Sequence, residues 1–503
     1  MFCKLNSYSL NGIEALPINV EIDLQPGLPG FDIVGLPDSA VKESKERVKS
    51  AIKNSGFTFP ICHITVNLSP ADIRKEGSLY DLPIALGILY CLQEIPINAL
   101  KDTICIGELA LDGTLRGVRG LLPLLCAIHE NTLPCIVPYD NLSEATLIQG
   151  LNVHLATHLT EVVAFLRKEC SLTLCPTCPS KESSPSSINY SDVRGQNAAK
   201  RGLLLCAAGY HNAILIGPPG SGKTMLAERL PTILPPLTKK ECIEITKIYS
   251  VANQLSDYQI ITQRPFRMPH HTISQYGLTG GGLHPKPGEI SLAHLGVLFL
   301  DELLEFNKHS LDLLRQPLES HTITLSRAQM SLSYPANFLF LSATNPCPCG
   351  YYPNTDKCTC SLQAIKKYLS KLSAPLIDRI DIHIETHVPT LKELEDPAPL
   401  TSEEMMRQVQ KAHAKQLKRF KNTTITYNSK IPTQYINTYC QITSHAKLLL
   451  NQWFQNTSAS IRAYDKILRL ALTIADVDDC EVIDTPQIAE AINYRLLDRQ
   501  FWA

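Results

Sequence analysis

The sequence predicts an α/β multidomain protein with an N-terminal α+β domain, a central P-loop α/β domain and a C-terminal helical domain. Its 503 residues suit about three domains of ordinary size. A glycine-rich phosphate-binding motif lies near the middle of the chain, between a strand-like and a helix-like segment. The residues after about position 397 contain few glycines and have a helical composition.

The expected domain boundaries follow changes in composition. Residues 1–168 alternate apolar runs with turn signals, which is typical of a compact α+β domain, and residues 41–54 have the charged amphipathic pattern of a helix. Residues 169–190 are rich in Pro, Ser and Cys without periodicity, so we expect a linker there. The central domain then covers residues 191–396, and the helical domain covers residues 397–503.

The bulk composition argues against a membrane-spanning or secreted protein. No apolar run approaches the roughly 18 residues that a membrane span needs, and the first residues lack the apolar stretch of a signal peptide. Seventeen cysteines without a secretory signal favour reduced thiols and a cytoplasmic location, and they allow metal sites. The net charge of −1 gives no overall electrostatic attraction to nucleic acid.

One local cluster of positive charge departs from this neutral background. Arg407, Lys411, Lys415 and Lys418 are spaced by four, four and three residues, so a helix would place them on one face. A solvated helix face explains such a stripe more simply than a DNA contact does.

The run GPPGSGKT matches the P-loop pattern G-x-x-x-x-G-K-[ST]. Its glycines let backbone N–H groups turn toward phosphate oxygens at a helix N-terminus, where an anion is favoured. We expect the Lys223 ammonium to reach the β- and γ-phosphates of ATP and the Thr224 hydroxyl to bind Mg²⁺. Residues 212–216 are the expected strand before the loop, and residues 225–230 the expected helix after it. The candidate nucleotide-binding residues are Gly217, Pro218, Pro219, Gly220, Ser221, Gly222, Lys223 and Thr224.

Two further apolar runs end in polar residues that suit ATP hydrolysis. Residues 296–302 end in two carboxylates, as a Walker B motif does. We expect Asp301 to hold the Mg²⁺ hydration shell and Glu302 to polarise the attacking water. Residues 337–345 form another strand-like run, and Asn345 at its end suits a second group that orients water.

A cluster of cysteines with the pattern C-x-C-x₈-C-x-C follows directly after this run. The pattern predicts a tetrahedral Zn²⁺ site that fixes the loop, and four free thiols are the alternative. Cys175 and Cys178 also form a C-x-x-C pair, but they lie in the expected linker without a second pair, so we expect no metal there. The four clustered residues are Cys347, Cys349, Cys358 and Cys360.

Several longer strings resemble the magnesium-chelatase-like AAA+ family, in its ComM/YifB group. The resemblance runs nearly end to end and implies a Lon-protease-like N-terminal domain, an AAA+ ATPase core and a helical lid. It also implies ATP and Mg²⁺ as cofactors, a hexameric homo-oligomer, and movement on single-stranded and branched DNA that drives branch migration in natural transformation. The matching strings are residues 192–196, 267–272, 287–294, 314–319, 376–381 and 462–464, together with the P-loop.

The resemblance gives roles to three arginines. In this family a neighbouring subunit supplies an arginine finger to the γ-phosphate, and Arg379 matches that residue. Arg462 matches the sensor arginine of the helical lid, and Arg315 is a third candidate. A surface ion pair is the alternative for each of them.

Two pore-loop segments also follow from the resemblance. Residues 264–295 are rich in glycine and proline, so we expect an insertion without regular helix or strand. A hairpin of residues 322–327 and 331–334 is expected before the third strand. Lys286 and Arg327 on these segments are candidate DNA phosphate contacts, with solvated basic residues as the alternative.

The N-terminal domain lacks the residues that a Lon-type protease needs. Such enzymes use a Ser–Lys dyad with the serine in a K-D-G-x-S string, whereas residues 75–79 read KEGSL. Leu79 occupies the serine position, Ser78 lies one residue early, and residues 120–125 contain no lysine. A serine without an adjacent base is a poor nucleophile, so we expect no proteolysis.

The sequence therefore favours an ATP-driven DNA translocase or helicase. An ATP-dependent protein-remodelling or protease-associated protein is a second hypothesis, although the missing dyad counts against degradation. A chelatase-type motor subunit, which inserts Mg²⁺ into a porphyrin together with partner subunits, is a third. DNA-stimulated ATPase activity would distinguish the first hypothesis from the other two.

Overall fold

The computed structural model describes residues 1–96, 99–100, 103–131, 133–148, 150–176, 188–255, 260–282, 286–327, 330–354, 356–394, 400–457 and 460–495. The chain forms two compact units, one of Met1–Glu182 with Cys242–Ile261 and one of Ser183–Glu241 with Thr262–Ala503. Sequence analysis assigned residues 242–261 to the central domain, whereas they group with the first unit. One reason is a buried hydrogen bond of 2.7 Å from Ser250 Oγ to Glu144 Oε2.

The first unit is built on a mixed eight-stranded sheet with the order β10-β9-β8-β5-β1-β2-β4-β3. β1 and β2 form an antiparallel hairpin, and buried positions recur at every second residue because strand side chains point to alternate faces. A separate small pair is formed by β6 (Glu108–Leu109) and β7 (Leu115–Arg116). The sheet strands are β1 (Phe2–Asn11), β2 (Glu14–Gln25), β3 (Gly30–Val34), β4 (His63–Ser69), β5 (Ile104–Cys105), β8 (Cys135–Pro138), β9 (Val153–Ala156) and β10 (Thr173–Leu174).

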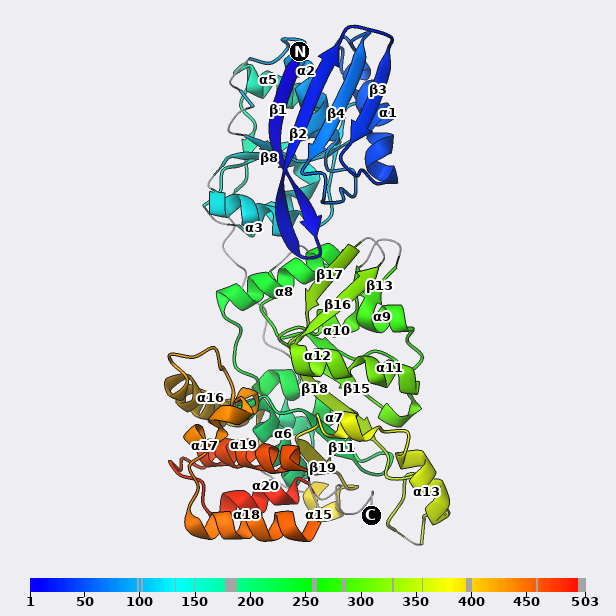
Figure 1. Ribbon diagram of the computed structural model, residues 1–503. Helices are drawn as coiled ribbons and strands as arrows, with labels where there is room; N and C mark the ends of the chain where they lie inside the picture. The colour runs from blue at the N-terminus through cyan, green and yellow to red at the C-terminus, as the bar shows by residue number, and fades with distance from the viewer. Residues whose placement is uncertain are drawn as a thin grey trace. The chain divides into compact units, whose positions relative to one another are not determined.

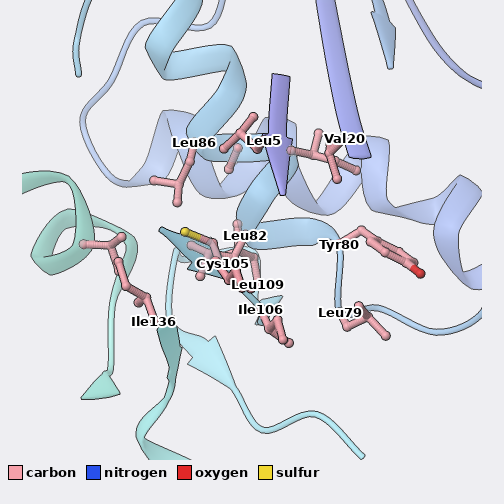
Figure 2. Close-up of a cluster of buried hydrophobic side chains, with 14 of the residues drawn as sticks. Leu5, Val20, Leu79, Tyr80, Leu82, Leu86, Cys105, Ile106, Leu109 and Ile136 are labelled. Atoms are coloured by element: carbon pink, nitrogen blue, oxygen red, sulfur yellow. The ribbon is translucent and has the colours of Figure 1, made fainter. Parts of the chain in front are cut away.

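Helices complete the first unit. α1 (Ser39–Asn54) confirms the helix predicted at residues 41–54 and begins after Asp38, whose carboxylate accepts from Val41 N at 2.7 Å. α2 (Asp81–Cys91) is buried on nearly every side, and Figure 2 shows its Leu82 and Leu86 in the core with side chains of β1, β2 and β5. The other helices are α3 (Leu121–Asn131), η1 (Tyr139–Asn141), α4 (Leu142–Ala145), α5 (Leu159–Leu166) and α8 (Lys239–Ala252).

The second unit contains a parallel five-stranded sheet with the order β12-β15-β18-β11-β19 (Figure 1). All four residues of β11 and of β15 are buried, as expected for a parallel sheet covered on both faces. The three predicted strands are confirmed as β11, β15 and β18, and their carboxyl ends meet at one edge of the sheet. The strands are β11 (Ala213–Ile216), β12 (Phe266–Arg267), β15 (Val297–Leu300), β18 (Leu339–Thr344) and β19 (Ile382–Glu385).

The structure of residues 264–295 differs from the prediction of an insertion without regular helix or strand. It begins with a strand of the central sheet, β12, and contains α9 (Gln275–Thr279), a small pair of β13 (Gly280–Gly281) with β14 (Lys286–Pro287), and α10 (Glu289–Leu292). The glycines permit this pairing rather than preventing it. A Cβ on Gly288 would lie 2.3 Å from Gly280 N, so the two backbones approach more closely than side chains would allow.

Short helices and one hairpin surround the sheet. The hairpin of β16 (Thr322–Arg327) and β17 (Met330–Pro335) confirms the predicted one. The helices are η2 (Tyr190–Asp192), α6 (Asn197–Gly209), α7 (Lys223–Glu228), η3 (Leu230–Ile233), η4 (Leu303–Glu305), α11 (Lys308–Leu313), α12 (Arg315–Ser320), α13 (Leu362–Leu369), α14 (Ala374–Ile377) and α15 (Leu391–Leu394).

The C-terminal part of the second unit is helical, as predicted. α16 begins with a capping box, in which the Thr401 hydroxyl accepts from Glu404 N and the Glu404 carboxylate accepts from Thr401 N. Its basic stripe is partly paired, because Lys411 and Lys415 bind Asp479 at 2.8 and 2.7 Å. The elements are α16 (Ser402–Arg419), η5 (Asn428–Lys430), η6 (Thr433–Tyr435), α17 (Ile436–Tyr439), α18 (Ser444–Thr457), α19 (Ile461–Val477) and α20 (Thr485–Asn493). Among the described residues, no helix has the length and apolarity to span a membrane.

Candidate functional site

The P-loop joins β11 to α7 at the carboxyl edge of the parallel sheet. Gly217 has no room for a side chain, because an added Cβ would lie 2.1 Å from Thr386 Oγ1. Gly220 and Gly222 have φ values of +76° and +81°, in the left-handed region that favours glycine. Close packing at Gly217 and the backbone conformation at Gly220 and Gly222 therefore explain all three glycines of the motif.

Lys223 lies within this loop and is held by neutral acceptors. Its ammonium donates to Gly217 O at 2.8 Å, to Pro218 O at 2.9 Å and to Asn345 Oδ1 at 3.1 Å. Burial lowers the pKa of Lys223, while the carboxylates of Asp301 and Glu302 oppose that change. Since charged acceptors bind ammonium groups more strongly than carbonyls do, a phosphate in the loop would compete well for this side chain.

Thr224 and the two acidic residues after β15 lie beside the loop. Thr224 Oγ1 donates to Asp301 Oδ2 at 2.8 Å, so a hydroxyl and a carboxylate oxygen converge, and both suit Mg²⁺. Glu302 adopts a left-handed conformation with φ of 49°, and its N–H donates to Asp301 Oδ1 at 2.9 Å. Such a conformation is costly for glutamate, and strain of this kind clusters at functional sites.

Sequence analysis gave no role to His271, which lies next to Glu302. Its Nδ1 is 3.8 Å from Glu302 Oε2, and its ring lies 4.1 Å from that of His270. Both histidines belong to the family-like string at residues 267–272. His271 lies four residues after β12, which pairs directly with β15, and the sequence does not show this pairing.

Gln196 and Thr386 form hydrogen bonds that hold the P-loop in place. The sequence alone did not indicate this role for either residue. Gln196 is 1% exposed, and its amide donates to Ser221 O at 3.0 Å and to the carbonyl of His387. Ser221 Oγ shares a hydrogen bond of 2.8 Å with Thr386 Oγ1. The string at residues 192–196 was the only sequence signal for this support.

Arg379 and Arg462 lie at the opposite end of the parallel strands from the P-loop. Both line a cavity of about 680 Å³ that Asn212 and Asn337 also line. These two asparagines precede β11 and β18, whereas the P-loop follows β11. Because all five strands are parallel, the cavity lies at the amino edge of the sheet, opposite the P-loop edge.

Arg315, the third arginine considered, has one partner on the neighbouring turn of chain and one far along the sequence. It pairs with Asp312 at 2.7 Å and donates to Ser373 Oγ at 3.1 Å. These contacts fit the ion-pair alternative for this residue.

The four clustered cysteines meet in space. Their sulfur atoms all lie within 4.8 Å of one another, as the ligands of a single metal ion do. A hydrogen bond from Tyr351 N is the largest influence that lowers the pKa of the Cys349 thiol, to about 6. The cluster residues are Cys347, Cys349, Cys358 and Cys360.

The cysteine loop packs on the P-loop. A Cβ on Gly350 would lie 2.6 Å from Pro219 Cδ and 3.8 Å from Asn345 Cγ. Gly350 therefore contacts the phosphate-binding motif directly, and Asn345 lies two residues before the first cysteine. The cluster is placed to fix one wall of the candidate nucleotide site.

Family comparisons agree with this arrangement. Residues 189–394 match the family model described as magnesium chelatase, subunit ChlI, and residues 20–141 match that of subunit ChlI of Mg-chelatase. Residues 399–495 match the model of the ChlI C-terminal region. The chain thus has a β-rich N-terminal domain, a parallel-sheet chelatase-type ATPase domain and a helical C-terminal region.

Full-length relatives decide the family. YifB of Escherichia coli strain K12 is 42% identical over 97% of this chain and 96% of its own length. Competence protein ComM of Haemophilus influenzae is 41% identical over 97% of the chain and 96% of its own length, and YifB of Salmonella typhimurium has the same identity and shares. The chain belongs to the ComM/YifB family. Its ATPase domain is of a kind that hydrolyses ATP with Mg²⁺.

Of the two candidate DNA contacts of this ComM/YifB protein, the structure describes the side chain of one. Lys286 is exposed on β14, beside the glycine-rich pair. The side chain of Arg327 lies outside the described residues, as do Cys178 and half of the expected linker.

Among the described residues of the N-terminal domain, Ser78 has an acidic partner and no lysine partner. The Ser78 hydroxyl donates to the Glu108 carboxylate, while Lys75 is fully buried and donates to the carbonyl of Pro70. These contacts agree with the absence of a Ser–Lys dyad.

Proposed function

We propose that this protein is an ATP-dependent DNA translocase or helicase that promotes branch migration of recombination intermediates, as in natural transformation. The observation that carries the proposal is the near-complete match to a competence protein, at 41% identity over 97% of the chain. The DNA would be single-stranded and branched. The protein would act in the cytoplasm, where DNA and ATP occur together.

The proposed catalytic cycle uses residues at the carboxyl edge of the sheet. Lys223 would bind the β- and γ-phosphates, and Thr224 and Asp301 would bind Mg²⁺, which screens the phosphate charge during transfer. Glu302 would accept a proton from the attacking water, and Asn345 would orient that water. The contacts Lys223–Asn345 and Thr224–Asp301 support these roles, because they already bring the groups together.

We infer that the active form is a homo-oligomer, of hexameric type in this family. Arg379 and Arg462 line a cavity at the amino edge of the sheet, and β11 alone separates the two edges by four residues at about 3.3 Å each. Neither arginine can therefore serve its own P-loop without rearrangement. In a ring, both would meet the γ-phosphate bound by a neighbouring copy.

We also propose that the four cysteines bind a structural Zn²⁺ ion. Four thiolates in tetrahedral reach of one point are the usual ligands of structural zinc, and the site leaves no open position for catalysis. The close packing of Gly350 on Pro219 supports a role in holding the nucleotide site in shape.

Lys286 and Arg327 are the proposed DNA phosphate contacts, on the insertion and on the β16–β17 hairpin. Exposed Lys286 suits a backbone contact, which would position DNA without reading its sequence. Loss of such a contact should weaken binding to all sequences alike and reduce its salt dependence.

A chelatase-type motor is the second candidate, because all three family models carry the chelatase name. One experiment separates the two. ATPase rates are measured with single-stranded DNA, with branched DNA and without DNA, alongside displacement of a labelled strand from a branched substrate. Several-fold stimulation of the ATPase rate by DNA, together with displacement of the labelled strand, supports the translocase. An ATPase rate that no form of DNA changes rules it out.

A further inference from the structure

The guanidinium of Arg379 already has partners within its own chain. Its Nη2 donates to the Glu319 carboxylate, and its Nη1 donates to the carbonyl of Pro375. The Arg379 side chain is only 14% exposed, whereas that of Glu319 is 58% exposed. Within the described residues the Arg379 Nε makes no hydrogen bond. The charge that would serve a neighbouring nucleotide is therefore held by an acidic partner that solvent can reach.

Glu319 lies at the end of a helix that continues directly into the hairpin. α12 ends at Ser320, and the single residue His321 separates it from β16. His321 has a left-handed φ of 57°, its N–H donates to Pro317 O at 3.0 Å, and its carbonyl accepts from Ala336 N at 2.7 Å. One residue thus ties the end of α12 to both strands of the hairpin, which Figure 1 shows beside α12.

The cavity that holds this pair is lined by five basic and four acidic side chains. Glu319 and His321 line it, as does Lys430, which donates to His321 Nε2 at 3.0 Å. Of the other acidic groups, Asp381 is paired with Lys466 at 2.7 Å, and Asp378 and Asp465 also line the cavity. An anion that entered the cavity would compete with Glu319 for Arg379. The basic side chains that line it are Arg379, Lys430, Arg462, Lys466 and Arg469.

We propose that Glu319 is a positioning residue that restrains Arg379 until a neighbouring copy presents the γ-phosphate of ATP. The proposal rests on the proposed function of Arg379 as an arginine that acts between subunits. When the phosphate takes the guanidinium, Glu319 loses its partner, and α12 is free to move the base of the hairpin. The exchange links occupancy of one subunit's nucleotide site to the DNA-binding hairpin of the next.

Such an exchange is physically reasonable for this pair. A phosphate carries more charge than a carboxylate and binds arginine in a bidentate manner. The Glu319 carboxylate is more than half exposed, so water can solvate it once Arg379 leaves. The pair is exposed on the carboxylate side only, and this access of solvent weakens it relative to a fully buried pair.

The test compares full-length E319Q, E319D and wild type in steady-state ATPase assays, with kcat and KM for ATP measured with and without branched DNA. E319Q should raise the DNA-independent kcat about threefold or more and reduce the stimulation by DNA. E319D, which keeps the carboxylate, should restore most of the stimulation. E490Q is the matched control, because it removes another Arg–Glu pair, with Arg201 at 3.0 Å, outside the cavity.

The outcomes distinguish a failure of this inference from a failure of the proposed role of Arg379 between subunits. R379A at wild-type activity would refute Arg379 as the residue acting between subunits. If R379A is inactive while E319Q matches wild type in basal rate and in stimulation by DNA, the restraint by Glu319 is refuted. The role of Arg379 between subunits then still stands. E319Q with reduced activity, unchanged oligomer size and an unchanged melting temperature would also overturn it. If E319Q fails to fold, E319A, which also removes the carboxylate, decides by the same two rates.

Discussion

The Lys223 ammonium and the Asn345 amide oxygen lie 3.1 Å apart, and this hydrogen bond joins the P-loop to the end of β18. The two residues are 122 positions apart in the chain. They meet because β11 and β18 are adjacent parallel strands whose carboxyl ends share one edge. The same edge brings Asp301 against Thr224, so four residues from three strands form one site.

Asn345→Ala should lower kcat about a hundredfold, because the attacking water would lose a group that orients it. ATP binding should change little, because Lys223 keeps its position through the carbonyls of Gly217 and Pro218. Binding of a fluorescent ATP analogue and the steady-state rate check the two parts. Lys223→Ala is the comparison and should abolish binding itself. An N345A protein that no longer binds nucleotide would contradict a purely catalytic role.

Glu302→Gln should block hydrolysis while ATP remains bound. Removing a general base commonly costs about 10²–10⁴-fold in rate. The amide keeps the size of the side chain, and the backbone at φ of 49° is no more strained than in the wild type. The variant should accumulate as an ATP-bound oligomer in sizing experiments. E302Q that hydrolyses ATP at the normal rate would move the base elsewhere, with His271 at 3.8 Å as the next residue to test.

The sequence predicted the local part of this site. The glycine spacing of the P-loop and the acids after β15 are set by backbone conformation within a few residues, so the pattern alone shows them. The contacts of Gln196 with Ser221 and of His271 with Glu302 join distant segments, and only the tertiary fold creates them. The arginine cavity was missed for the same reason, since it depends on strand direction and order.

The predictions from the sequence that differ from the structure also have physical explanations. Glycine-rich residues 264–295 were expected to be irregular, because glycine disfavours isolated helices and strands. Here the close approach of Gly280 and Gly288 allows pairing, and β12 gains stability from its neighbour β15. Residues 242–261 carry no boundary signal, and their grouping with the first unit follows from contacts such as Ser250 with Glu144.

Gly350→Ala should raise the KM for ATP several-fold without removing zinc, because the added Cβ would lie 2.6 Å from Pro219 Cδ and push on the P-loop. Cys358→Ser should instead lose the metal, with the same effect on KM. Metal analysis of the purified proteins and ATPase kinetics check both. Cys170→Ser is the control, because Cys170 is exposed and lies outside the cluster. Wild-type protein without stoichiometric zinc would remove the proposed metal site.

Asp381→Asn should destabilise the second unit strongly. Burial alone would raise the pKa of Asp381, but Lys466 and His211 outweigh it and hold that pKa well below its ordinary range. The amide would leave the Lys466 ammonium, which is only 12% exposed, without its partner at 2.7 Å, and breaking a fully buried pair commonly costs about 3–5 kcal/mol, which is an upper bound here. Chemical denaturation of both proteins at pH 7 measures the difference.

The pH dependence of that difference tests its electrostatic origin. A carboxyl whose pKa is depressed in the folded state adds stability above its unfolded pKa of about 3.9 and loses it as pH falls toward the folded value. The gap between wild type and D381N should therefore be constant from about pH 8 to pH 5 and shrink below pH 4. Asp479→Asn is the matched comparison, because its pairs with Lys411 and Lys415 are exposed and should matter little. Equal effects of D381N and D479N would show that burial of the Asp381–Lys466 pair contributes nothing.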